Sequence, residues 1–97
     1  MDYRVCIQNS LDYIEGHLQE CLTVDELAKI AGFSSYHYYR VFNVYVGMPV
    51  VEYIRRRRLA YAAAELARGR RIVDIALDYG FETHNGFAKA FRKVIVG

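Results

Sequence analysis

The sequence predicts an all-α protein in which two helix-turn-helix subdomains are joined by a long central linker helix, with about six to seven helices in total. Apolar residues recur at helical spacing between clear capping residues. No bounded run alternates β-branched and polar residues, as a half-buried strand would. One helical segment also occurs twice. With 97 residues, 54% of them hydrophobic, the chain can form one domain or two very small ones.

The first helix is expected over residues 3–20. Its aliphatic residues fall three or four positions apart and so share one face: Ile7, Leu11, Ile14 and Leu18. Both cysteines, Cys6 and Cys21, belong to this helix and its end. Together with His17 they lack the spacing of a zinc site, so we expect reduced thiols, no metal site and no cofactor.

The second and third helices have clear boundary signals. Thr23 can accept a hydrogen bond at the start of the second helix while Glu26 reaches back to it, which is a capping box. Gly32 ends this helix. One of the serines at 34–35 caps the third helix, which is expected to end near Gly47.

The linker helix is expected over residues 49–68, with Pro49 in its first turn and Gly69 after its end. About 20 residues make a rod of ~30 Å. Successive major-groove faces of B-DNA lie ~34 Å apart, so such a rod could hold two reading helices on one face of a duplex. The four arginines at 55–58 span more than one turn and cannot share a face. One or two of them could pack or pair with Glu52 or Glu65, and others could reach phosphate.

Two shorter helices complete the chain. The fifth is expected over residues 72–79 and stops at Gly80, and Thr83 caps a sixth that runs to about Ile95. The chain is thereby divided into a first subdomain, a linker helix and a second subdomain: residues 1–48, 49–69 and 70–97.

The repeat pairs residues 26–33 with residues 74–81 at an offset of 48. In both copies an acidic residue comes first, an alanine third and Gly-Phe last. The alanine allows a second helix to cross closely, and the glycine allows a positive φ in the turn. Two helices that meet at a short glycine turn form the motif that places its second helix in the major groove of DNA. The alternative is a pair of antiparallel helices that does not bind DNA. A single copy of the motif would leave this alternative open, whereas two copies favour DNA binding.

The charge is unevenly distributed, although the formal net charge is only +2. Residues 1–31 carry two basic and six acidic side chains, whereas residues 32–97 carry eleven basic and five acidic ones. A basic second part favours a polyanionic partner such as nucleic acid. An unevenly charged surface without such a partner is the alternative.

Motifs from about Ile7 to Val94 together resemble the AraC/XylS family of bacterial regulators. They are Leu27-Ala28-x-x-Ala31-Gly32-Phe33-Ser34, Phe42, Gly47-x-Pro49, Tyr53-Ile54-Arg55, Leu59, Ala63, Leu66, Ile75-Ala76-x-x-x-Gly80-Phe81 and Phe87-x-x-x-Phe91. The resemblance implies a bilobed all-α domain with a central linker helix, which binds double-stranded promoter DNA in the bacterial cytoplasm, within the nucleoid. It also implies activation, or sometimes repression, of transcription through RNA polymerase.

The chain departs from the family pattern at three positions. Arg71 stands where a small capping residue is usual, and Met48 stands where Thr or Ser is common. Val96 stands where the family commonly has glycine, and the usual closing segment is absent. We therefore expect a truncated C-terminus, with any effector-binding domain lying beyond it.

The third helix carries the first set of candidate DNA contacts. Its inward face is expected to consist of Tyr38, Val41, Phe42 and Tyr45. Its outward face then presents Ser35, Tyr36, Tyr39 and Arg40. Arg40 can donate a bidentate pair to guanine, and Tyr36 can pack on a thymine methyl group or bond a phosphate. His37 either touches the DNA backbone or packs on the first helix. The resemblance assigns base contacts to Tyr36, Tyr39 and Arg40.

The sixth helix carries the second set. Phe87 and Phe91 are expected to face inward, and the candidate DNA contacts are Thr83, His84, Asn85 and Lys89. Asn85 can pair with adenine, and Lys89 with guanine or phosphate. The resemblance assigns contacts to His84, Asn85 and Lys89.

Other function classes have weaker support. The sequence contains no HExxH, no glycine-rich phosphate loop and no Gly-x-Ser-x-Gly, so we do not expect an enzyme. No apolar run approaches the ~20 residues that span a bilayer, and the first ten residues lack the apolar stretch of a signal peptide. A helical protein-interaction module, with nine tyrosines as an adhesive surface, remains the alternative to DNA reading.

Overall fold

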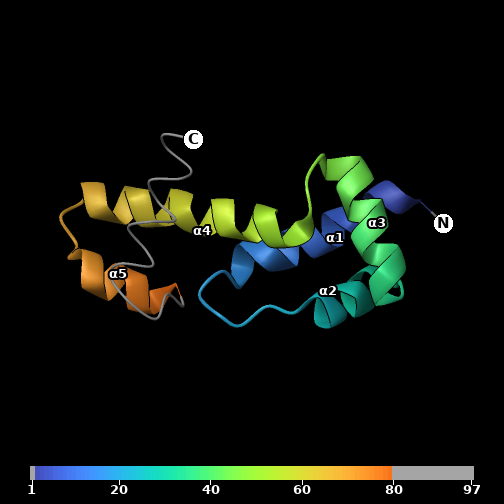
Figure 1. The fold of residues 1–97 in the computed structure, drawn as a ribbon, viewed down its shortest axis with the longest axis horizontal. Coiled ribbons are helices and arrows are strands. Elements are labelled where there is room, and N and C mark those ends of the chain that lie inside the picture. The colour runs from blue at the N-terminus through green and yellow to red at the C-terminus, as the bar shows by residue number, and fades with distance from the viewer. Residues whose placement is uncertain (1, 80–97) are drawn as a thin grey trace. The chain divides into compact units, whose positions relative to one another are not determined.

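A computed structural model describes residues 2–79, and every regular element in that range is a helix (Figure 1). The helices in order are α1 Tyr3–Gly16, α2 Val24–Ala31, α3 Ser35–Val46, α4 Val50–Ala67 and α5 Ile72–Asp78. The all-α prediction is confirmed. The expected sixth helix, with Thr83 as its cap, lies outside the described residues, as does Gly80. No described helix is both long and apolar enough to cross a membrane.

The chain forms two compact units, Met1–Ile54 and Arg55–Gly97, and the division falls inside α4. In the first unit α1, α2 and α3 pack against one another in all three pairs. The core side chains among them are at most 3% exposed: Ile7, Ile14, Leu27, Ala28, Tyr38 and Phe42. Burying one large apolar side chain stabilises a fold by about 1.5–3 kcal/mol, so this cluster accounts for much of the stability of the unit.

Helix α1 is shorter than the expected 3–20. It begins after Asp2, whose side chain accepts a hydrogen bond from the Arg4 N–H at 2.9 Å, and it ends at Gly16. His17 then leaves the helical region with φ −134°, and its N–H bonds the Ile14 carbonyl. Glycine is a poor helix former, which explains why the periodic pattern outlasts the helix. Leu18 is nevertheless 5% exposed and belongs to the core.

The caps of α2 and α3 are as expected, and the structure selects Ser34 over Ser35 as the cap of α3. Thr23 accepts from the Glu26 N–H, and Ser34 accepts from the His37 N–H, each at 3.2 Å. Gly32, with φ +84°, ends α2 in the left-handed region, where a side chain would be strained. The Phe33 N–H reaches back to the Ala28 carbonyl at 2.9 Å and closes this end of the helix.

Only half of the expected capping box forms at the start of α2. The Glu26 carboxylate accepts a 2.6 Å hydrogen bond from the Tyr13 hydroxyl of α1 instead of reaching back to Thr23. This hydrogen bond is the main reason why the pKa of Tyr13 is raised, and desolvation and nearby carboxylates act in the same direction. The box residue therefore links two helices rather than capping its own.

A buried hydroxyl pair joins α1 to α3. Tyr38, which is fully buried, donates to the Ser10 hydroxyl at 3.0 Å, and Ser10 donates to the Ile7 carbonyl at 2.8 Å. Because each buried polar group has a partner, the pair holds α3 against α1 without an unsatisfied hydroxyl. Burial raises the pKa of Tyr38, and the bond to Ser10 partly offsets this.

The inward face of α3 is predicted correctly at Tyr38, Val41 and Phe42, but Tyr45 is 50% exposed. Tyr45 lies two turns beyond Tyr38, near the end of α3. There it lines surface hollows together with residues of α1, such as Tyr3 and Arg4. A residue on the inward face of a helix is therefore buried only where a neighbouring helix packs against that part of the face.

In the second unit, α4 ends at Ala67, and Gly69 turns the chain with φ +93°. Arg70 then forms ion pairs with Glu65 of α4 at 3.2 Å and with Asp78 of α5 at 2.8 Å. The hydrogen bond to Asp78 is the main cause of the raised pKa of Arg70. This one cation therefore ties the end of α4 to the end of α5.

Candidate nucleic-acid interface

Helix α3 exposes a row of polar and aromatic side chains at its N-terminal half. Tyr36 is 73% exposed and Tyr39 41% exposed, and Arg40 is also exposed. The cap at Ser34 fixes where the helix starts, and burial of Tyr38 fixes which side faces outward. Three of the four contacts expected on α3 therefore lie together on an exposed surface, as a base-reading face requires.

Ser35, the fourth expected contact on α3, lies differently. It is half-buried, and its hydroxyl donates to the Asp25 carboxylate of α2. This hydrogen bond links the two helices of the helix-turn-helix, α2 and α3. The hydroxyl that the sequence assigned to DNA thus has an internal partner, which sequence spacing alone does not reveal.

Arg40 and Tyr36 form a pair on the exposed face. The Arg40 Nη1 donates to the Tyr36 hydroxyl at 3.3 Å, and the guanidinium carbon lies 5.7 Å from the centre of the Tyr36 ring. Residues four apart are neighbours on a helix surface, so the spacing permits this contact. The guanidinium is held by a neutral partner and keeps its charge.

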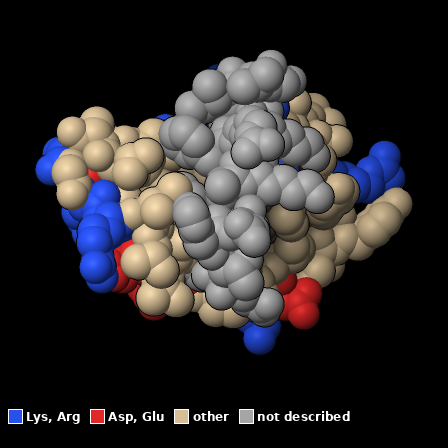
Figure 2. All heavy atoms as spheres, turned by 60° about the vertical axis from the view of Figure 1, so that its left-hand side comes forward, with Lys and Arg blue, Asp and Glu red and all other residues tan. Residues whose placement is uncertain are grey.

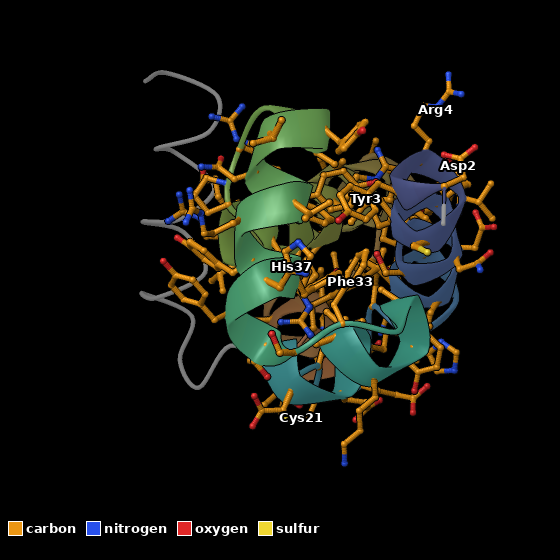
Figure 3. The ribbon with its side chains drawn as sticks, turned by 90° about the vertical axis from the view of Figure 1, so that its right-hand side faces the viewer. Asp2, Tyr3, Arg4, Cys21, Phe33 and His37 are labelled. Carbon is orange, nitrogen blue, oxygen red and sulfur yellow. The ribbon has the colours of Figure 1, made fainter. Side chains whose placement is uncertain are left out.

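His37 packs on the first helix, which is one of the two outcomes left open for it. The centre of its ring lies 5.6 Å from that of Tyr3 of α1, with the rings edge-on, and 4.9 Å from that of Phe33 in the turn. The ring centres of Tyr3 and Phe33 are 5.4 Å apart. Figure 3 shows these three rings between the α1 and α3 ribbons. The cluster braces the start of α3 against the start of α1.

A hollow of about 460 Å³ opens beside this cluster. Its lining is mainly aromatic and aliphatic and includes Tyr3, Tyr36, His37, Arg40, Val41, Val44 and Tyr45. Val44 is 78% exposed, and it was not assigned to this surface from the sequence. Its place four residues after Arg40 and eight after Tyr36 is the signal that could have found it, because this spacing continues the same helix face.

The acidic residues of the first three helices are unevenly distributed. Helix α3 contains no acidic residue, whereas α1 and α2 contain four: Asp12, Glu15, Asp25 and Glu26. An acid-free helix with an exposed arginine has the electrostatic character of a phosphate-facing surface.

In the second unit, two arginines are engaged by carboxylates. Arg70 bridges Glu65 and Asp78, and the Arg71 Nε donates to Asp74 at 3.2 Å. Acidic side chains lie directly beside basic ones in the left-hand part of Figure 2. Arg71, which replaces the usual small cap, provides no side-chain cap to α5.

The second set of expected contacts lies outside the described residues: Thr83, His84, Asn85 and Lys89. Their assignment as DNA contacts stays a prediction. Ala76, expected to be small for close helix packing, is 2% exposed and therefore fits that part of the repeat.

Comparison with known proteins identifies this arrangement. A family described as a helix-turn-helix domain matches residues 27–95, which is most of the chain. The regulatory protein SoxS of Salmonella typhimurium is 36% identical over 94 residues, covering 96% of this chain and 88% of SoxS. The chain belongs to the AraC/XylS family of helix-turn-helix DNA-binding domains. Members of this family are bacterial transcription regulators rather than enzymes.

Other relatives are longer than this chain. The HTH-type transcriptional activator AarP of Providencia stuartii is 45% identical over 87 residues, covering 89% of this chain and 64% of AarP. The regulator YbfP of Bacillus subtilis is 42% identical over 95 residues, covering 97% of this chain and 32% of its own length. The chain thus spans less than two thirds of these two relatives.

Solved structures support the fold. An AraC-type regulator from Chromobacterium violaceum matches with a TM-score of 0.88 at 26% identity, covering 94% of this chain and 82% of that one. The DNA-binding domain of AdpA, solved in complex with a target DNA, has a TM-score of 0.84 at 21% identity, covering 94% and 83%. The second likeness concerns the fold alone.

Proposed function

We propose that this chain binds double-stranded promoter DNA sequence-specifically, with α3 lying in a major groove and presenting Tyr36, Tyr39 and Arg40 to base edges. The observation that carries the proposal is the exposed, acid-free N-terminal half of α3, which is capped at Ser34 and anchored by buried Tyr38. In helix-turn-helix proteins, residues near the start of the second helix of the motif meet the bases.

The side chains at the start of α3 have distinct roles in this proposal. The Tyr36 ring packs on a thymine methyl group. Arg40 donates two hydrogen bonds to the O6 and N7 atoms of a guanine. Tyr39 contacts a base edge or a sugar-phosphate oxygen through its hydroxyl. Ser35 has a structural role through Asp25, because its hydroxyl is already donated there.

The second unit reads an adjacent major-groove segment through Thr83, His84, Asn85 and Lys89. Sequence similarity between residues 26–33 and 74–81 supports this part of the proposal. Two reading heads in one chain would bind an asymmetric operator without a dimer. The whole regulator then acts on RNA polymerase in the bacterial cytoplasm, under control of an effector-binding domain elsewhere in a longer protein.

The test is selection of bound sequences from random duplex DNA, followed by affinity measurement across a salt series. We expect one asymmetric motif with two half-sites about one helical turn apart, and affinity that falls steeply with added salt as phosphate contacts release counterions. Enrichment of only one half-site would contradict reading by the second unit. Salt-independent or absent DNA binding would favour the protein-interaction module, whose surface would be the apolar hollow with Val44 and Tyr45.

A further inference from the structure

We propose that Tyr36 is a positioning residue, which holds the Arg40 guanidinium in the orientation that reads a base. Base preference at the Arg40 contact would then depend on the Tyr36 side chain, even where Tyr36 itself does not touch that base. The proposal rests on the proposed function and adds to it the device that orients the reading group.

The first argument is the geometry of the pair. A hydrogen bond of 3.3 Å from Nη1 to the Tyr36 hydroxyl and a guanidinium carbon 5.7 Å from the ring centre act on the same group. Arginine has several rotatable bonds and loses much rotamer freedom when it is ordered. A partner that restrains the side chain before binding lowers this entropy loss, because part of the ordering has already occurred.

The second argument is direction. Side chains on a helix lean toward its N-terminus, so the long side chain of Arg40 extends back over the turn that carries Tyr36. This moves the guanidinium toward the start of α3, where a recognition helix meets base edges. A released Arg40 side chain would instead sample positions along the groove and toward the phosphates.

The third argument is the chemical nature of the partner. A phenol accepts one N–H and leaves the positive charge and the remaining N–H groups of Arg40 available, whereas a carboxylate would neutralise the cation. Among the described residues, no carboxylate pairs with Arg40. The attraction between a cation and an aromatic ring grows when water is excluded, so docking on DNA would strengthen the restraint.

The chain offers a matched control on α4. There the Arg57 guanidinium carbon lies 5.3 Å from the centre of the Tyr61 ring, and the partners are again four positions apart. The order along the helix is reversed, and neither residue belongs to a reading helix. Tyr61→Phe therefore removes a phenol hydroxyl beside an arginine without touching the proposed site.

The experiment uses the full chain and the duplex that it selects. The readout is the ratio of affinities for this duplex and for one changed at the base pair that Arg40→Ala ceases to discriminate. Tyr36→Phe should lower that ratio about two- to five-fold, the size expected for one exposed polar or cation–ring contact. Tyr36→Ala should lower it further, Tyr61→Phe should leave it unchanged, and thermal unfolding should not change for either Tyr36 variant because Tyr36 is 73% exposed.

The decisive measurement combines the two substitutions. The readout here is the affinity for the selected duplex, because Arg40→Ala by itself already brings the affinity ratio to about one. In an Arg40→Ala background, Tyr36→Phe should no longer lower this affinity, because the Tyr36 hydroxyl acts through Arg40. An equal loss of affinity in both backgrounds would overturn the proposal, because it would show that the Tyr36 hydroxyl acts on DNA independently of Arg40. An affinity ratio that both Tyr36→Phe and Tyr36→Ala leave unchanged when Arg40 is present would overturn it as well. A wild-type chain that enriches no motif would contradict the proposed function itself, and this is visible before any variant is made.

Discussion

Helices α2 and α5 occupy equivalent places in the sequence repeat, and they agree in the core but differ at the surface. Leu27 and Ala28 of α2 match Ile75 and Ala76 of α5, and all four are at most 2% exposed. The polar partners differ. In α2, carboxylates accept hydrogen bonds from the neutral hydroxyls of Ser35 and Tyr13, whereas in α5 they pair with Arg70 and Arg71.

This difference shows which features a repeat preserves. Buried positions are constrained by the volume that neighbouring helices leave, so equivalent residues keep their size. Surface acids have no such constraint and take whichever donor lies near. Beside α2 hydroxyls serve as donors, and no described carboxylate pairs with Arg40 of the neighbouring α3, whereas beside α5 two arginines are engaged by carboxylates.

The largest expected effect tests the shared core. Leu27→Ala and Ile75→Ala each remove a fully buried aliphatic side chain and should lower the free energy of unfolding by about 2–5 kcal/mol. Urea unfolding followed by circular dichroism measures this loss for each variant. A loss in α2 with none in α5 would break the equivalence of the two helices.

The next effect tests how the two units use arginine. Arg40→Ala should weaken binding to the selected duplex by about 1–3 kcal/mol and abolish preference at one base pair. Arg71→Ala, which removes a cation paired with Asp74, should change affinity by much less. Fluorescence anisotropy titrations compare the two variants, and an equal loss for both would mean that pairing with Asp74 does not withhold Arg71 from DNA.

A smaller effect concerns the caps. Thr23→Ala removes the hydrogen-bonded cap of α2 and should cost about 0.5–2 kcal/mol of stability. Arg71→Ser places a capping hydroxyl at a residue whose backbone is already extended, with φ −75° and ψ 139°, and should raise stability by up to about 1 kcal/mol. Thermal unfolding distinguishes the two signs. A loss of stability in Arg71→Ser would show that the Asp74 pair matters more than a cap.

The smallest effect at neutral pH concerns the buried hydroxyl pair. Tyr38→Phe should cost about 0.5–1.5 kcal/mol, since the hydrogen bond to Ser10 is lost. Burial raises the pKa of Tyr38 above its ordinary value of 10.0, so the neutral phenol is favoured in the folded state. Its contribution to stability is therefore fully present below that value and is lost as the pH rises through the raised pKa.

Chemical unfolding at about pH 8 and about pH 11, on either side of the ordinary phenol pKa, measures this difference. The deficit of Tyr38→Phe relative to the wild type should shrink or reverse at the higher pH. Arginine–carboxylate pairs, such as Arg70 with Asp78, keep their charges there and provide no such dependence. A deficit that stays constant would indicate that the pKa of Tyr38 is the same in the folded and unfolded states.

The sequence predicted the five described helices, apart from the end of α1, and three of the four residues expected on the outward face of α3, because these features follow from local rules. Capping residues such as Thr23 and Ser34 and glycines such as Gly32 act within a few positions of themselves. Burial of Tyr38 and Phe42 follows from their spacing. Family membership followed from motifs of the same local kind.

Contacts between helices could not be predicted in the same way. Glu26 bonds Tyr13, Ser35 bonds Asp25, and Tyr38 bonds Ser10, over 13, 10 and 28 positions respectively. Such partners depend on how helices cross, which no periodicity states. The exposure of Tyr45 has the same origin, because its burial depends on how far along α3 the packing of α1 extends.

The placement of Tyr38 also has a consequence for how binding specificity could change during evolution. Each residue advances an α-helix by about 100°, so Tyr36 and Arg40, two positions on either side of Tyr38, lie about 160° from it on the far face of the helix. The groups that anchor α3 and the groups that face outward are therefore physically separate. New operator preferences can arise by exchanging side chains at 36, 39 and 40 while the anchor at Tyr38 and Ser10 stays intact, which makes this helix suited to library-based retargeting.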